Sequence, residues 1–196
     1  MINRLSLAAL VYGLVCAVSA NANTLVFADN FNSNTLGLNK VPTGWTVTNG
    51  TVDIIGTGFY DLQPGHGAYI DLDGSTSNAG ILSTSLSLTA GVTYTAAFSL
   101  AGNQRNASTE SVTVAFGDTS FVYAMPSSQA FTTYSLAFTP SASGSFALSF
   151  SNAGGDNVGA LLDNVSVTAV PEPQSLALLL AGVVVTGAVA RRRQLR

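Results

Sequence analysis

The chain has 196 residues, of which 47% are hydrophobic and only 9% charged, and its formal net charge is −3. Its single cysteine, Cys16, excludes a disulfide framework and a cysteine-ligated zinc site. Between residues 23 and 170, two basic side chains (Lys40 and Arg105) stand against nine acidic ones, a net charge of −7. Because affinity for phosphate requires clustered cations, this central part is not expected to bind nucleic acid.

The N-terminus has the pattern of a secretory signal peptide. Arg4 precedes an apolar run over residues 5–18, and Ala-Asn-Ala at 20–22 is a small-x-small cleavage site. Val-Ser-Ala at 18–20 is a second candidate site. We therefore predict a signal helix over residues 1–22, export through the Sec machinery, and a mature protein that lacks Cys16.

Residues 23–169 are predicted to form one domain, since about 150 residues can bury a sizeable core. Apolar residues alternate with Thr, Ser and Ala in run after run, as at 94–100 and 146–150, and this period of two indicates half-buried strands. Turn residues separate the runs every 8 to 12 residues or so, which is typical of a sandwich or barrel. The predicted strands are 25–28, 45–48, 51–55, 68–71, 80–88, 92–100, 111–116, 121–124, 131–138, 145–151 and 160–168, with 45–48 and 121–124 open to being loops.

This number of strands favours an all-β jelly-roll β-sandwich, in which the first and last strands are able to pair. The order of motifs also resembles the galactose-binding-like jelly rolls found in many carbohydrate-binding modules. That resemblance implies a structural Ca²⁺ near the junction of the two terminal strands, where Asp29 and Asp163 would meet. Local turns and caps made by Asp and Asn side chains are the alternative.

A second calcium candidate is Asp71-Leu72-Asp73-Gly74, because paired carboxylates followed by glycine suit a hard cation with oxygen ligands. The segment lacks the further acids of an EF-hand loop, so a solvated strand end running into an Asp-Gly turn is the competing interpretation. The only histidine, His66, lies between glycines in a predicted loop and cannot form a catalytic triad or a three-histidine zinc site by itself.

Aromatic and amide side chains in the loops suggest a sugar-binding surface, because a sugar ring presents an apolar face to an aromatic ring and hydroxyls to polar groups. Trp45 is equally suited to fill the core. The candidate ligand-binding residues are Trp45, Tyr60, Asp61, Gln63, Asn103, Gln104 and Arg105.

Catalytic motifs are absent from the sequence: it has no Gly-x-Ser-x-Gly elbow, phosphate loop or His-Glu-x-x-His. Glu110 is the only glutamate between residues 23 and 170, so a pair of glycosidase carboxylates would have to come mostly from aspartates. We predict that the protein is not an enzyme, and a glycan-active hydrolase remains the less favoured alternative.

The C-terminal segment 170–196 has three parts in order: Pro171-Glu172-Pro173, an apolar run over residues 176–190, and Arg191-Arg192-Arg193. A helix over the run would be about 22 Å long, slightly short of a bilayer core of roughly 30 Å. The arginines would stay on the cytoplasmic side, so the preceding domain would face outward.

This order resembles the PEP-CTERM sorting signal of Gram-negative, exopolysaccharide-producing bacteria. The resemblance implies that an exosortase recognises the transmembrane tail, cleaves near Pro-Glu-Pro and releases the protein to the outer surface or extracellular matrix. The predicted function is therefore a structural or adhesive role in a biofilm or floc, with exopolysaccharide as a candidate partner and the membrane contacted only through the tail. A carbohydrate-binding module is the alternative.

Overall fold

The structure, a computed structural model, describes residues 23–105 and 108–170, and every regular element within these ranges is a β-strand. All predicted strands are present, with ends within two residues of those expected, including the two segments that were open to being loops. The strands are β1 (Thr24–Asp29), β2 (Thr46–Thr48), β3 (Asp53–Gly56), β4 (Ala68–Asp71), β5 (Ile81–Leu88), β6 (Thr93–Ala101), β7 (Glu110–Phe116), β8 (Thr119–Met125), β9 (Thr132–Phe138), β10 (Gly144–Asn152) and β11 (Leu161–Val170).

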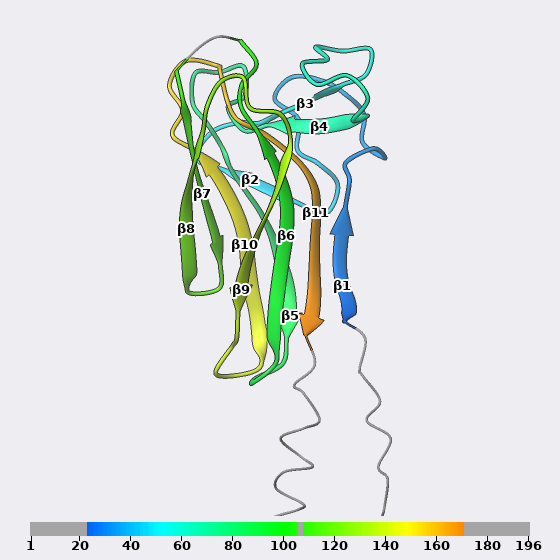
Figure 1. The fold of residues 1–196 in the computed structure, drawn as a ribbon, viewed down its shortest axis with the longest axis vertical. Coiled ribbons are helices and arrows are strands. Elements are labelled where there is room, and N and C mark those ends of the chain that lie inside the picture. The colour runs from blue at the N-terminus through cyan, green and yellow to red at the C-terminus, as the bar shows by residue number, and fades with distance from the viewer. Residues whose placement is uncertain (1–22, 106–107, 171–196) are drawn as a thin grey trace, which may run out of the picture. The chain divides into compact units, whose positions relative to one another are not determined.

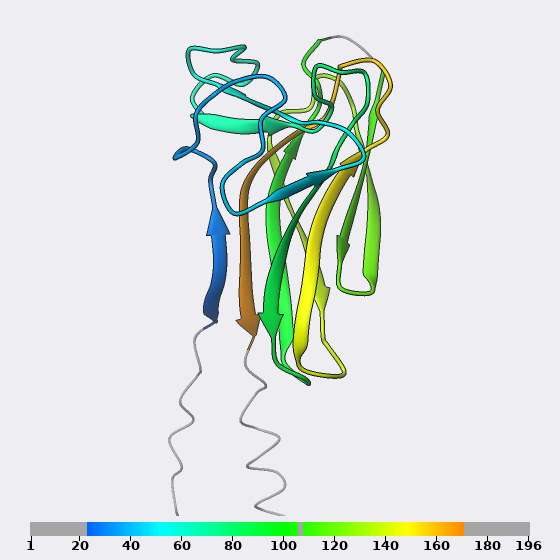
Figure 2. The ribbon, with the colours of Figure 1, turned by 180° about the vertical axis from the view of Figure 1, so that it is seen from behind.

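The strands form a two-sheet sandwich. The six-stranded sheet has the order β3-β4-β11-β6-β9, with β1 also paired to β11, and the five-stranded sheet has the order β2-β5-β10-β7-β8. From β4 onward the chain passes between the sheets in the strand order of a jelly roll, β4-β11-β6-β9 facing β5-β10-β7-β8. The expected pairing of the first and last strands is present, and β1 lies beside β11 (Figures 1 and 2). The two strands are antiparallel, with Phe27 opposite Val167.

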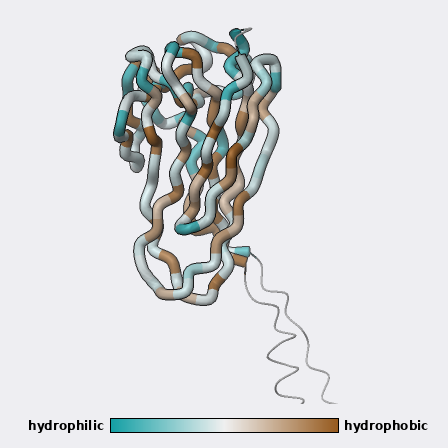
Figure 3. The backbone as a smooth tube through the Cα atoms, turned by 90° about the vertical axis from the view of Figure 1, so that its left-hand side faces the viewer, coloured by the Kyte–Doolittle hydropathy of each residue, from teal (hydrophilic) through white to brown (hydrophobic). Residues whose placement is uncertain are grey.

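Alternation along the strands separates the core from the outer faces. In β5, Leu82, Leu86 and Leu88 are buried, whereas Ser85 and Ser87 are exposed. The same alternation appears as brown and pale segments along the strands in Figure 3. Each sheet therefore presents an aliphatic and aromatic face to the other sheet. Removal of this apolar surface from water stabilises the fold by roughly 25 cal/mol for each Å² buried.

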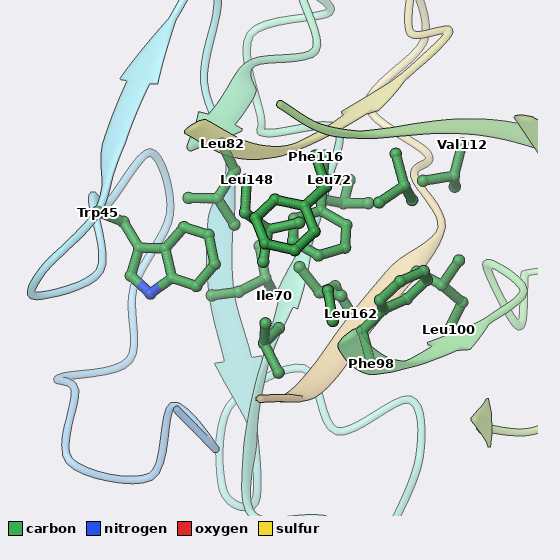
Figure 4. Packing of buried hydrophobic residues seen from close by; sticks show 14 of the residues in the cluster. Trp45, Ile70, Leu72, Leu82, Phe98, Leu100, Val112, Phe116, Leu148 and Leu162 are labelled. Carbon is green, nitrogen blue, oxygen red and sulfur yellow. The ribbon is translucent and has the colours of Figure 1, made fainter. Parts of the chain in front are cut away.

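Trp45 belongs to the main core between the sheets (Figure 4). Its side chain is only 6% exposed, its ring packs against Phe27, Phe31 and Phe150 with centroids 5.6 to 6.1 Å apart, and its Nε1 donates to Asp29 Oδ2 over 2.8 Å. Of the two roles open to Trp45, the structure therefore places this residue in core packing.

A second, smaller core lies on the outer face of the six-stranded sheet. Ile55 and Tyr69, on neighbouring strands, are covered by the 57–67 segment through Phe59 and Leu62. The Tyr69 hydroxyl accepts hydrogen bonds from the Leu62 and Gln63 amides over 2.6 and 2.8 Å, so it fixes this covering segment to the sheet. Burial raises the pKa of Tyr69 to about 12, and the phenol stays protonated at neutral pH.

Within the described ranges no helix is long and apolar enough to span a membrane. The predicted signal helix (1–22) and the predicted transmembrane helix of the tail lie outside the described residues.

Candidate functional site

A pocket of about 390 Å³ opens beside the 57–67 segment, at the end of the sandwich where the longest loops gather. Its walls come from β3, β4 and the loops around residues 38, 60, 75, 105 and 157. Its size is at the lower end of the range for small-molecule sites, about 300 to 1,000 Å³. The lining residues are Leu38, Asp53, Ile55, Tyr60, Leu62, Asp71, Ser75, Arg105 and Asn157.

Two aspartates from neighbouring strands form the polar wall. Asp53 on β3 is the direct cross-strand partner of Asp71 on β4, and both are nearly inaccessible to solvent. The Asp53 carboxylate accepts hydrogen bonds from the Asn39 amide (2.7 Å) and from the Ser75 amide and hydroxyl (3.3 and 2.7 Å). These donors provide hydrogen-bond partners for a carboxylate that is buried beside an acidic neighbour.

Arg105 provides the positive charge of the pocket. Its Nη2 donates to Asp71 Oδ2 in an ion pair, and its Nη1 donates to the Asn157 carbonyl over 2.6 Å. The Arg105 side chain is 29% exposed, whereas that of Asp71 is 2% exposed. The guanidinium is therefore the more accessible member of the pair, and both side chains line the pocket.

The turn that presents Arg105 is held by Asn103, which is fully buried. Asn103 Nδ2 donates to Glu110 Oε1 over 2.9 Å, and its Oδ1 accepts the Arg105 amide over 3.0 Å and the Ser127 hydroxyl over 2.6 Å. Gln104, at a left-handed φ of 57°, donates from Nε2 to the Gln129 carbonyl over 2.6 Å. Both side chains thus hold the loop that positions Arg105.

Tyr60 lies at the rim of the pocket with 65% of its surface exposed. A tight turn precedes it, closed by mutual amide-to-carbonyl bonds between Gly56 and Phe59 (2.9 and 2.8 Å). Gly56 has a φ of 144° and passes so close to the Gly67 carbonyl that a Cβ would collide with it, so the turn requires glycine there. The Tyr60 ring then packs edge-on against Phe59, with centroids 4.8 Å apart, and stays directed outward.

Burial raises the pKa of Asp71 to about 7, with a further contribution from the Asp53 charge, while the Arg105 guanidinium opposes the increase. The Asp71 Oδ1 also accepts the Asp73 amide over 3.1 Å. A carboxyl with such a pKa in a pocket is a common feature of ligand sites, although structural ion pairs produce it too.

The predicted ligand-binding residues therefore divide into two groups. Tyr60 and Arg105 line the pocket. Asp61 accepts a hydrogen bond from the Tyr69 hydroxyl over 3.1 Å, and the Gln63 amide donates to the same hydroxyl, so both residues hold the covering segment in place. Asn103 and Gln104 hold the Arg105 turn in the same way. Trp45 is in the core and does not line the pocket.

Sequence reasoning missed Asp53, Ser75 and Asn157 as pocket residues. Asp53 gave a usable signal, because it is a charged residue within the apolar run Val52 to Ile55, where a half-buried strand favours an uncharged side chain. Ser75 and Asn157 lie in turns, and only the folded chain brings them to the Asp53 and Arg105 side chains.

The two predicted calcium pairs have different surroundings. Asp29 accepts the Phe31 amide and Trp45 Nε1, while Asp163 is bonded to Asn164, and a surface hollow lined by Asp29 and Asn164 lies beside them. Asp71 pairs with Arg105, but the buried Asp73 Oδ1 has no hydrogen-bond partner among the described residues. No group of three or more His, Cys, Asp or Glu side chains in these ranges is arranged to hold a metal ion.

The two-sheet fold of the described domain is similar to that of several solved jelly-roll domains. It is similar to the CBM22-1 xylan-binding domain of Paenibacillus barcinonensis Xyn10C, with a TM-score of 0.52 and 16% identity over 78% of this chain and 98% of that domain. It is also similar to the CBM22-1-CBM22-2 tandem domain of the same protein (TM-score 0.53, 17% identity, 80% of this chain and 48% of the tandem).

A third similar structure is the CBM22-1-GH10 part of Clostridium thermocellum endo-1,4-beta-D-xylanase 10B, complexed with xylohexaose. The TM-score is 0.51 and the identity 14%, over 77% of this chain and only 29% of that one. At such low identities these likenesses establish the fold alone.

The chain belongs to the DUF642 family, described as a protein of unknown function, whose profile matches residues 24–168. Residues 169–194 match the PEP-CTERM protein-sorting motif, so the predicted sorting signal is confirmed and marks the protein for export and exosortase processing. Comparison with curated proteins gives no match.

Proposed function

We propose that this protein binds a glycan in the pocket beside Tyr60 and serves, after export, as a non-catalytic adhesive component of the cell surface or extracellular matrix. The observation that carries the proposal is the exposed Tyr60 ring at the rim of a pocket whose wall holds the Asp71–Arg105 pair. An aromatic ring can cover the apolar face of a sugar, while charged groups exchange strong hydrogen bonds with its hydroxyls.

The sandwich type and the sorting motif support the same proposal. Similar folds include xylan-binding domains, and a protein marked for export by a PEP-CTERM motif would meet polysaccharide outside the cell. Retention of exopolysaccharide in a biofilm or floc is the role that follows from such binding.

The hydrolase alternative is less consistent with the pocket. In a glycosidase two carboxyl groups flank the bond that breaks. Asp53 and Asp71 instead project from adjacent strands on the same side of one sheet, and Arg105 is paired with Asp71. This arrangement favours holding a sugar over protonating a glycosidic oxygen.

The test is a binding measurement on purified protein against an array of neutral and acidic glycans, followed by calorimetry on the best ligand. Tyr60→Ala and Arg105→Ala are each expected to weaken binding about tenfold or more, which corresponds to about 1.4 kcal/mol. Phe121→Ala is the matched control, because Phe121 is a similarly exposed aromatic on β8 that does not line the pocket. If the Tyr60 and Arg105 variants bind as well as the wild type, this pocket is not the binding site.

A further inference from the structure

The pocket lining includes three aliphatic side chains that the hydroxyls of an ordinary hexose would not contact favourably. They are Leu38, Ile55 and Leu62, and Leu38 is 40% exposed. A hydroxyl pressed against these side chains would lose its hydrogen bonds to water, which is unfavourable. A methyl group in the same position would instead be stabilised by its burial.

The pocket lining also has unused hydrogen-bond acceptors. A carboxylate offers about four acceptor positions. Asp53 accepts three hydrogen bonds from described residues and Asp71 accepts two, so both retain capacity for donors. Sugar hydroxyls can supply these donors.

Charge and size restrict the ligand further. The pocket contains two aspartates and one arginine within a domain of net charge −7, so an acidic sugar would meet like charge. A volume of about 390 Å³ leaves room for roughly one or two sugar units, as at the end or on a branch of a glycan.

From these three features we infer that the pocket selects a terminal or branching neutral sugar that carries a methyl group. The methyl group lies against Leu38, Ile55 and Leu62, the hydroxyls donate to Asp53 and Asp71, and Tyr60 covers the ring. A 6-deoxyhexose and an N-acetylhexosamine both provide this chemistry. The inference rests on the proposed glycan-binding function and gives that function its ligand class.

Matched sugar pairs test the inference on the purified protein. L-fucose differs from L-galactose only in having a methyl group in place of the hydroxymethyl group, and N-acetylglucosamine differs from glucose in its acetamido group. In competition or calorimetric titration, the methyl-bearing member of at least one pair is expected to bind about tenfold tighter. Which pair shows the preference identifies the source of the methyl group.

Leu38→Ser is the informative variant, because Leu38 is partly exposed and its replacement should leave the fold intact. It is expected to reduce the tenfold preference to about twofold or less. Val41→Ser is the matched control, since Val41 is a nearby aliphatic residue, 57% exposed, that does not line the pocket. Val41→Ser should keep the preference.

Three results would overturn the inference. Equal affinity within both pairs, with binding still weakened by Tyr60→Ala, would leave the glycan-binding proposal standing and remove the methyl preference. Equal loss of preference in Leu38→Ser and Val41→Ser would show that the aliphatic lining residues do not select the methyl-bearing sugar. Absence of binding to every glycan on the array would remove both proposals.

Discussion

Asp53 and Asp71 lie directly opposite each other on β3 and β4, two buried carboxyl groups on the same side of one sheet. Like charges in this position normally destabilise a sheet. Here Ser75 and Asn39 donate hydrogen bonds to Asp53, and Arg105 pairs with Asp71. The pocket thus retains two adjacent carboxyl groups whose unfavourable burial is offset by specific hydrogen-bond and ion-pair partners. Such locally unfavourable groups are common at binding sites.

Arg105→Met is expected to destabilise the protein more at alkaline than at acidic pH. Without the guanidinium, the pKa of Asp71 rises further above about 7, so the buried charge is unfavourable at about pH 8 and is neutralised at about pH 5. We expect a loss of about 1 to 3 kcal/mol at the higher pH, measured by urea unfolding. The double variant Arg105→Met, Asp71→Asn should recover most of the loss, and an equal loss at both pH values would contradict this account.

Trp45→Phe is expected to lower stability without weakening glycan binding. The smaller ring keeps part of the packing against Phe31 and Phe150 but leaves Asp29 Oδ2 without the indole donor. An unsatisfied, partly buried acceptor costs about 1 to 3 kcal/mol, which urea unfolding would detect. Reduced binding by the folded variant would return Trp45 to the list of ligand residues.

Stability should decrease as the pH rises through about 6, because of Asp163. Burial raises the pKa of Asp163 to about 6 from 3.8, so the folded state holds a proton that the unfolded state has lost. The stabilisation is complete below about pH 4 and is lost as the pH passes the folded-state pKa. Because one pKa unit corresponds to about 1.4 kcal/mol, the free energy of unfolding falls by up to about 3 kcal/mol.

Asp163→Asn should make this decline smaller, since the amide oxygen can still accept the Asn164 amide and only the similar contribution of Asp71 then remains. Melting temperatures measured from about pH 4 to about pH 8 would show it. A variant with the same decline as the wild type would assign the effect to other groups, of which Asp71 is the first candidate.

Structural calcium stays a prediction with two candidate positions. A bound Ca²⁺ needs six to eight oxygen ligands, so backbone and amide oxygens would have to supplement either aspartate pair. Excess calcium is expected to raise the melting temperature relative to EDTA. Loss of this difference in Asp163→Asn would place the ion at the terminal strands. Loss in Asp73→Asn would place it at the buried Asp73 Oδ1, which has no hydrogen-bond partner among residues 23–105 and 108–170. Identical melting in calcium and EDTA would remove both sites.

The sorting motif predicts a shortened protein at its destination. Protein recovered from the native cell surface should have an intact mass that corresponds to cleavage near Pro171-Glu172-Pro173 and loss of the arginine cluster. A C-terminus still ending at Arg196 would contradict exosortase processing.

Much of the fold was predictable because strand formation is encoded locally. The alternation of Leu82, Leu86 and Leu88 with small polar residues indicates a half-buried strand before any partner is known. The pairing of β1 with β11 followed from the expected strand order. The candidate site was predicted less well, since Tyr60 and Arg105 reached the pocket while four of the other candidates serve to hold loops.

The sequence by itself determined an all-β central domain that is acidic and has hardly any basic residues, and a sorting motif, because periodicity, charge and short motifs are properties of neighbouring residues. Only the tertiary structure decided that Trp45 fills the core and that Asp53, Ser75 and Asn157 join Arg105 around one pocket. Burial and contact depend on strand register and loop path. These place residues far apart in the sequence, such as Asp71 and Arg105, within reach of each other.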